Sequence, residues 1–106
     1  MKYINDEDFD DIVLDANIPV VVKFTASWCA PCRSLQIVLD RLQKANPNVL
    51  FLCVDVDENP NLVDDYEIRS LPTTLIFHNG NCEGTVKGIS KEHILQAVLD
   101  RYKGDV

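Results

Sequence analysis

Two hydrophobic patterns alternate along the chain and together predict its secondary structure. Apolar residues three and four positions apart indicate helices, whereas short, almost continuous apolar runs indicate strands that are buried on both faces. The helical pattern predicts four helices: Asp6 to Asp15, Pro31 to the residues before Asn46, a short helix through Leu62 to Tyr66, and Ile94 to Tyr102. The apolar runs predict strands at Val20 to Thr25 and Val49 to Val56, with a further short strand at Lys2 to Ile4 as an option.

A hairpin is predicted near the end of the chain. Asn79-Gly80, a pair that favours tight hairpin turns, joins two further strands, Thr73 to His78 and Cys82 to Lys87. Ser90 is predicted to cap the last helix. The strand–helix–strand portion implies parallel neighbours, and the hairpin adds antiparallel ones. We therefore predict an α/β fold in which a mixed central sheet of four to five strands has helices on both faces.

Composition indicates one packed domain over residues 1–106. The chain has 106 residues, 46% of them hydrophobic, and no repeat or linker divides it. Its net charge of −7 argues against a nucleic-acid or anionic-membrane partner, because both attract clustered Lys and Arg. No segment is long and apolar enough to span a bilayer, and the N-terminus lacks the layout of a secretory signal. We expect a monomer in the cytoplasm.

The segment Trp28-Cys29-Ala30-Pro31-Cys32 lies where a predicted strand passes into a predicted helix. Unpaired N–H groups and the helix dipole at this position stabilise a thiolate on the first cysteine. Cys32 follows within one turn, and Pro31 stiffens the spacer. The segment therefore predicts dithiol–disulfide exchange, in which Cys29 attacks a target disulfide and Cys32 resolves the mixed disulfide.

Two other interpretations of the cysteine pair are a zinc half-site and a structural disulfide. Zinc needs a second ligand pair, and Cys53, His78, Cys82 and His93 do not provide the spacing. A structural bridge here would close too small a loop to stabilise much. We expect no metal, and we interpret Cys53 as a small buried hydrophobe. Strand alternation groups Cys82 with Val86, which favours packing over a regulatory thiol.

Three blocks of the sequence resemble the thioredoxin family, in the same order and over nearly the whole chain. They are VVVKFTASWCAPCRSL, VDVDENPNLVDDYEIRSLPTTLIFHNG and VKGISKEHI. The resemblance implies a thioredoxin-like fold and reduction of protein disulfides through a reversible Cys29–Cys32 pair. It also implies a thioredoxin reductase, with NADPH upstream, as the electron donor, and no bound cofactor on this chain.

The resemblance also assigns roles to residues around the pair. The family's matching proline follows a cis peptide bond, so Pro72 is expected beside the cysteines, with the backbone of Leu71 free to pair with an extended substrate. A shallow apolar rim for substrate is implied around Cys29, formed by Trp28, Ala30, Pro31, Leu71, Pro72, Gly88 and Ile89.

The sequence departs from the family behind the cysteine pair. Lys23 occupies the place of a buried acid, and Cys53 that of the acid's charged partner. One hypothesis is that Lys23 stabilises a nearby thiolate, on Cys32, and titrates low because it is buried. The alternative is that Lys23 extends its ammonium to the surface and has no redox role. Ala30 replaces the usual glycine, for which we expect a modest effect on redox potential.

Two other functions remain open from the sequence. The pair could serve a disulfide oxidant or isomerase in an exported compartment, because redox direction depends on the relative stability of thiolate and disulfide. Alternatively, the fold could be a binding module whose redox pair is dispensable. Loss of function on replacing both cysteines would separate an enzyme from such a module.

Overall fold

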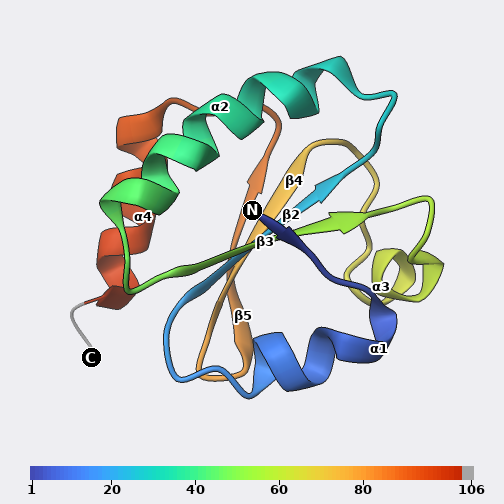
Figure 1. Ribbon diagram of the computed structural model, residues 1–106, viewed down its shortest axis with the longest axis horizontal. Coiled ribbons are helices and arrows are strands. Elements are labelled where there is room, and N and C mark those ends of the chain that lie inside the picture. Colours follow the sequence, from blue (N-terminus) through green and yellow to red (C-terminus); the bar gives the residue numbers. More distant parts are fainter. Residues whose placement is uncertain (104–106) are drawn as a thin grey trace.

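A computed structural model describes residues 1–103, which form a mixed five-stranded sheet with helices on both faces (Figure 1). The order of elements is the predicted one, including the short first strand. The elements are β1 (Lys2–Tyr3), α1 (Asp6–Phe9), a π-helical turn η1 (Asp10–Leu14), β2 (Val20–Thr25), α2 (Ala30–Ala45), β3 (Leu50–Asp55), α3 (Pro60–Asp65), β4 (Thr73–His78), β5 (Asn81–Lys87) and α4 (Glu92–Lys103). None of the helices within residues 1–103 has the length and apolar character needed to cross a membrane.

The sheet has the strand order β1-β3-β2-β4-β5. Strands β1, β3 and β2 run parallel, and β4 and β5 add two antiparallel pairings. Strand β2 lies at the centre, and all six of its residues are buried, Lys23 and Thr25 included, which confirms the prediction of a central strand covered on both faces. Because a central strand contacts helices on both faces, its end is a rigid base for whatever follows it.

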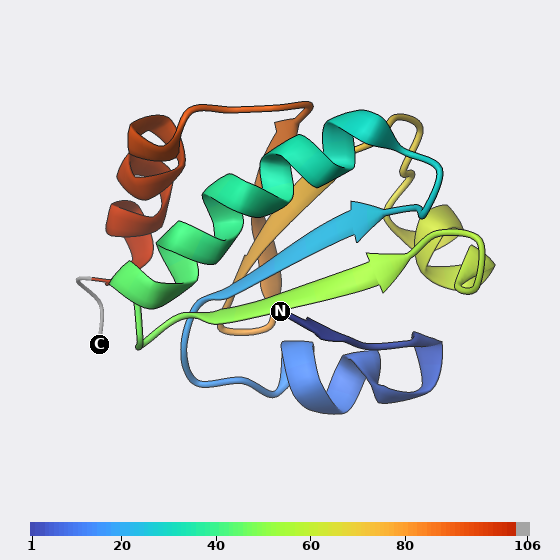
Figure 2. The same ribbon diagram turned by 45° about the horizontal axis from the view of Figure 1, so that its top comes forward.

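The two faces of the sheet are covered by different helices (Figure 2), and each face carries its own hydrophobic core. On one face α1, η1 and α3 cover a core that includes Phe9, Val22 and Phe77. On the other face α2 and α4 cover a core that includes Leu39 and Leu99. The residues of β2 alternate between these cores, which places Lys23 on the face covered by α2.

The first helix has the predicted extent but not a uniform pitch. After α1 the chain widens into η1, where the Asp15 N–H donates to the Asp10 carbonyl at 3.2 Å, five residues back. Phe9 and Val13 still face the core. The hydrophobic spacing fits either pitch over so short a segment, so it predicts the buried face and not the π turn.

The last helix extends two residues before the predicted run Ile94 to Tyr102, and its capping position lies one residue later than predicted. The Lys91 carbonyl accepts hydrogen bonds from the N–H groups of Ile94 and Leu95, at 3.1 and 3.2 Å. Lys91, directly before Glu92, therefore occupies the capping position, and the prediction that Ser90 caps this helix is wrong. Residue preference at caps identifies the region of a helix start but not its register.

The hairpin turn between β4 and β5 is the predicted one. Asn79 and Gly80 both have positive φ, at 54° and 81°, as a tight two-residue turn requires. A Cβ added to Gly80 would lie 3.1 Å from the Leu14 carbonyl oxygen, so the turn packs closely against the end of η1. Both conformation and space therefore require glycine at position 80.

Replacing Gly80 with alanine is expected to lower the free energy of unfolding by at least about 1 kcal/mol, because an L side chain is strained at this φ. Urea denaturation measures the loss. Gly88→Ala is the matched control, since Gly88 has a similar φ of 78° but nothing within 4 Å of an added Cβ. Gly80→Ala should cost more than Gly88→Ala; an equal or smaller cost would show that the Leu14 contact is unimportant.

A β-bulge in the hairpin changes the position of Cys82. Ile76 pairs with Gly84 while Phe77 pairs with Cys82, so Glu83 is an extra residue on β5. One extra residue inverts the alternation that follows it. Cys82 therefore shares the face of its partner Phe77 and not that of Val86, so the prediction that Cys82 and Val86 pack together is wrong. The side chain of Cys82 is exposed.

Candidate active site

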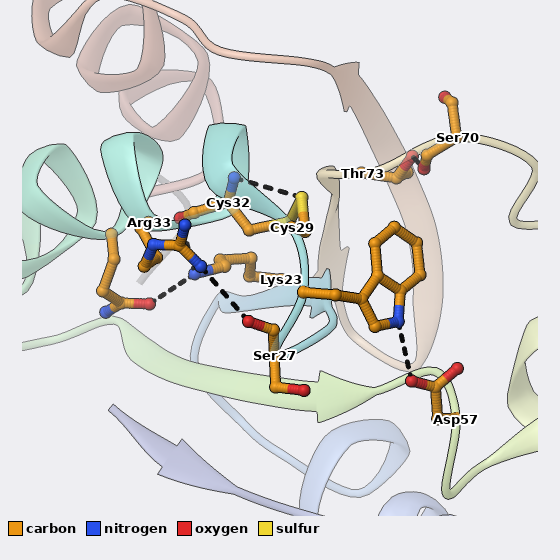
Figure 3. Close-up of a disulfide and its surroundings, with 10 residues drawn as sticks. Lys23, Ser27, Cys29, Cys32, Arg33, Asp57, Ser70 and Thr73 are labelled. Carbon is orange, nitrogen blue, oxygen red and sulfur yellow. Dashed lines mark hydrogen bonds between the residues drawn. A yellow bond between two sulfur atoms is a disulfide. The ribbon is translucent and has the colours of Figure 1, made fainter.

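The cysteine pair lies at the start of α2, just beyond the end of the central strand (Figure 3). Cys29 is the N-cap residue, and its Sγ accepts a hydrogen bond from the Cys32 N–H at 3.2 Å. Pro31 stands in the first turn of the helix, where no backbone donor is needed. The expected position of Cys29 at a helix N-terminus is confirmed, and the N–H groups there favour negative charge on its sulfur.

Cys29 and Cys32 are joined by a disulfide, with their Cα atoms 5.3 Å apart. Both residues are almost completely buried, at 4% and 1% exposure. Ala26, with Val56 and Leu71, packs against them. Within residues 1–103 no group of three or more His, Cys, Asp or Glu side chains is arranged to hold a metal ion.

A groove of about 620 Å³ opens beside the disulfide. Its lining brings together Cys29 and four residues expected near it from the sequence, Trp28, Ala30, Pro31 and Leu71. The opposite wall was not predicted and is formed by Val56, Val63, Ile68, Arg69 and Ser70. The carboxyl ends of neighbouring parallel strands meet at one edge of a sheet, and this rule could have placed the segment after β3 beside the cysteines.

Trp28 is the most exposed large apolar side chain at the groove, at 67%. Its Nε1 donates to the Asp57 carboxylate at 2.9 Å, which ties the indole to the segment after β3 (Figure 3). This contact was not predictable from the sequence, because Asp57 belongs to an acidic stretch that is typical of a solvated surface. The hydrogen bond limits the orientations of an otherwise exposed ring.

The substrate-binding residues predicted after α3 fall into two groups, one that lines the groove and one that does not. The Leu71–Pro72 peptide bond is cis, as the resemblance implied. Leu71 lines the groove, whereas Pro72 is buried and its carbonyl accepts from the Gly88 N–H at 2.8 Å. Gly88 thus lies beside Pro72, and Ile89 is exposed next to it, but neither is part of the groove lining.

Lys23 lies behind the pair and is only 2% exposed. Its Nζ donates to the Cys32 carbonyl at 3.0 Å and to Gln36 Oε1 at 2.6 Å (Figure 3). The alternative that this ammonium extends to the surface is therefore wrong. Burial lowers the pKa of Lys23, while the nearby Cys53 and Asp40 act in the opposite direction.

Cys53 is the other unusual residue behind the pair. It stands opposite Lys23 in the β2–β3 ladder, and its Sγ lies 3.8 Å from the same oxygen, Gln36 Oε1. The expected burial of Cys53 is confirmed. Burial raises the pKa of the Cys53 thiol, and Lys23 opposes the shift, so Cys53 is a neutral thiol at neutral pH. A second cavity of about 450 Å³ adjoins these two side chains.

The fold and the site define a class of protein: an α/β domain with a disulfide-forming cysteine pair at the head of the helix that follows its central strand. The sequence model of the Thioredoxin family matches residues 1–101, and the chain belongs to this family. The predicted family and fold are confirmed, together with the family's redox-active cysteine pair, which is consistent with protein-disulfide reduction.

Individual relatives support the same assignment. The chain is 39% identical over 100 residues to Thioredoxin 1 of Synechococcus elongatus, covering 93% of this chain and 94% of the relative. It is 38% identical over 93 residues to a thioredoxin of Rickettsia felis, covering 87% and 89%. It is 37% identical over 99 residues to the chloroplastic Thioredoxin M5 of Oryza sativa, covering 92% of this chain but 58% of that relative. The chain therefore spans less than two thirds of the rice protein.

Proposed function

We propose that this chain is a protein-disulfide reductase in which Cys29 is the nucleophile and Cys32 the resolving thiol. The single observation that carries the proposal is the position of Cys29. It caps α2, accepts an N–H hydrogen bond on its sulfur, forms a disulfide with Cys32 and lines an apolar groove. This combination provides an activated thiol, a resolving partner and a surface for a target.

The reaction starts from the reduced pair. The Cys29 thiolate attacks one sulfur of the target disulfide, forming a mixed disulfide and releasing the other target sulfur, which takes up a proton. Cys32 then loses its proton and attacks the Cys29 sulfur, which releases the second target thiol and leaves the Cys29–Cys32 disulfide. Two electrons have moved from the pair to the target, and a separate donor must return them.

The groove suits an extended, partly apolar segment of a target protein. Trp28, Pro31, Ile68 and Leu71 supply apolar contact beside Cys29. We assign substrate binding to this surface and to the adjacent Pro72, Gly88 and Ile89. Ala30 and Pro31 fix the spacing of the two cysteines and thereby support the redox couple. A groove lined mainly by apolar side chains, with Arg69 and Ser70 among its members, favours many protein disulfides over one small molecule.

The partners follow from membership of the family. A reductase must regenerate the dithiol, and we propose an NADPH-dependent thioredoxin reductase in that role, with no cofactor on this chain. We also propose a single domain over residues 1–106 that acts as a monomer in the cytoplasm. The likeness to bacterial relatives over about nine tenths of their length supports this location, although other relatives are named as chloroplastic.

Replacing Cys32 with serine should trap the mixed disulfide, because the resolving thiol is then missing. The variant is reduced, freed of small thiols and mixed with a disulfide-containing protein, and the adduct is located by mass spectrometry. Cys82→Ala should be present throughout, since Cys82 is an exposed free thiol. We expect a stable adduct on Cys29 and none when Cys29 is also serine. Absence of the adduct, while Cys29 still reacts with iodoacetamide, would contradict the proposal.

A further inference from the structure

A buried cation lies directly behind the disulfide. The Lys23 ammonium is enclosed between β2 and α2 and donates to the carbonyl of Cys32 itself (Figure 3). Its second acceptor is the neutral amide of Gln36. Taking an ammonium out of water is unfavourable unless nearby groups compensate for the lost hydration. The contacts of Lys23 therefore decide which states of the cysteine pair it favours.

Among residues 1–103, the positive charge of Lys23 has no direct anionic partner. Gln36 links Lys23 to the carboxylate of Asp40, accepting from Lys23 through Oε1 and donating through Nε2 to Asp40 at 2.8 Å. Within the described residues 1–103 no carboxylate oxygen lies within ion-pair distance of Lys23; the ion pair found there joins Arg41 and Glu92 on the helical surface. Cys53, the neighbour of Lys23 on β3, is a neutral thiol at neutral pH.

We propose that Lys23 is a positioning residue that stabilises the reduced cysteine pair through its charge and so makes this chain a stronger oxidant than it would be with a neutral residue at position 23. The inference rests on the proposed exchange reaction. A disulfide carries no charge, whereas the reduced pair carries a thiolate. A cation in a low-dielectric site lowers the free energy of that thiolate and leaves the disulfide unaffected. The redox equilibrium of the Cys29–Cys32 pair therefore moves from the disulfide toward the dithiol.

Other charged and titratable groups face the cavity beside Lys23 and Cys53. Their effects on the redox equilibrium must be distinguished from the effect of Lys23. These groups come from the N-terminal segment, α2 and β3, and are Met1, Tyr3, Arg33, Asp40 and Cys53. Arg33 is the other side-chain cation, but it is exposed and donates to the Ser27 carbonyl at 3.2 Å. Water and salt screen an exposed charge far more than a buried one, so Arg33 should contribute less.

The first test is the redox equilibrium of Lys23→Met against glutathione buffers of defined ratio, read by mass after alkylation. We expect the equilibrium to shift about tenfold toward the disulfide, which is about 30 mV more reducing. The alkylation profile of Cys29 should also move to higher pH. Arg33→Met, the matched control, should shift the equilibrium less than twofold. A Lys23→Met equilibrium within twofold of the original would overturn the proposal.

Two further measurements distinguish an effect of the Lys23 charge from a structural effect of its side chain. Lys23→Gln keeps a hydrogen-bond donor without charge, so its redox equilibrium with glutathione should match that of Lys23→Met. If Lys23→Gln instead had the equilibrium of the original chain, the role of charge would be overturned. In the unaltered chain, NMR titration of the Lys23 amine should give a higher pKa in the reduced than in the oxidised protein, by reciprocity. Equal values would also overturn the proposal. None of these experiments uses a protein substrate. Failure of the Lys23 proposal can therefore be distinguished from failure of the proposed reductase function, which the trapping experiment tests.

Discussion

Replacing Cys29 with serine is expected to reduce the rate of protein-disulfide reduction to that of the reductant alone. A serine hydroxyl remains protonated at neutral pH and forms no disulfide, so both the attacking thiolate and the intermediate are lost. The measurement is the turnover of a protein disulfide in the presence of dithiothreitol, with and without the chain. Cys53→Ala is the matched control, because it removes a thiol that is buried and not part of the pair.

The same experiment separates an enzyme from a binding module. If the chain acted only through its surface, Cys29→Ser would bind its partners and perform its function unchanged. The groove residues stay in place in this variant, so binding and exchange can be measured independently. Turnover by Cys29→Ser at more than a small fraction of the original rate would contradict the role of Cys29 as nucleophile.

Replacing Phe77 with alanine is expected to lower the free energy of unfolding by about 3–5 kcal/mol. Phe77 is 1% exposed and is one of three aromatic rings, with Phe9 and Tyr66, that all contact one another. Its ring centroid lies 5.5 Å from that of Phe9 and 5.4 Å from that of Tyr66, with both pairs edge-to-face. The substitution removes these contacts and leaves a cavity, because the central sheet cannot collapse to fill it. Equilibrium denaturation in urea measures the loss.

The control for this prediction is Ile94→Ala. Ile94 lies on α4 and is 47% exposed, so its truncation should change the free energy of unfolding by no more than about 0.5 kcal/mol. A loss below about 1 kcal/mol in Phe77→Ala would show that the aromatic cluster is more deformable than its geometry indicates.

Local sequence signals were sufficient for most of the fold. Val20 to Thr25 is apolar on both faces, which identified the central strand, and Asn79-Gly80 identified the hairpin. The bulge at Glu83 was not predictable, because alternation alone assumes a regular strand and carries no record of an extra residue. The prediction of the face on which Cys82 lies was wrong for that reason.

From residue spacing alone, the candidate site was predictable only where its parts are contiguous in the chain, and the family resemblance added Leu71 and Pro72. Cys29 and Cys32 lie within one helical turn, and the start of that helix is readable from Pro31. The opposite wall of the groove comes from Val63 and Ile68, more than 30 residues further along. Tertiary packing alone brings these residues to the cysteines, so single-sequence spacing could not identify them.

The exposed thiol of Cys82 also makes the molecule suitable for fluorescence. Phe77 pairs with both Val20 and Cys82, so Cys82 stands at the Val20 end of the sheet, whereas Trp28 follows the Thr25 end of β2. Trp28 is the sole tryptophan of the chain. A maleimide dye attached to Cys82 would accept excitation energy from Trp28 along the length of β2. Docking of a target over the groove could then be followed optically, without a label on the target.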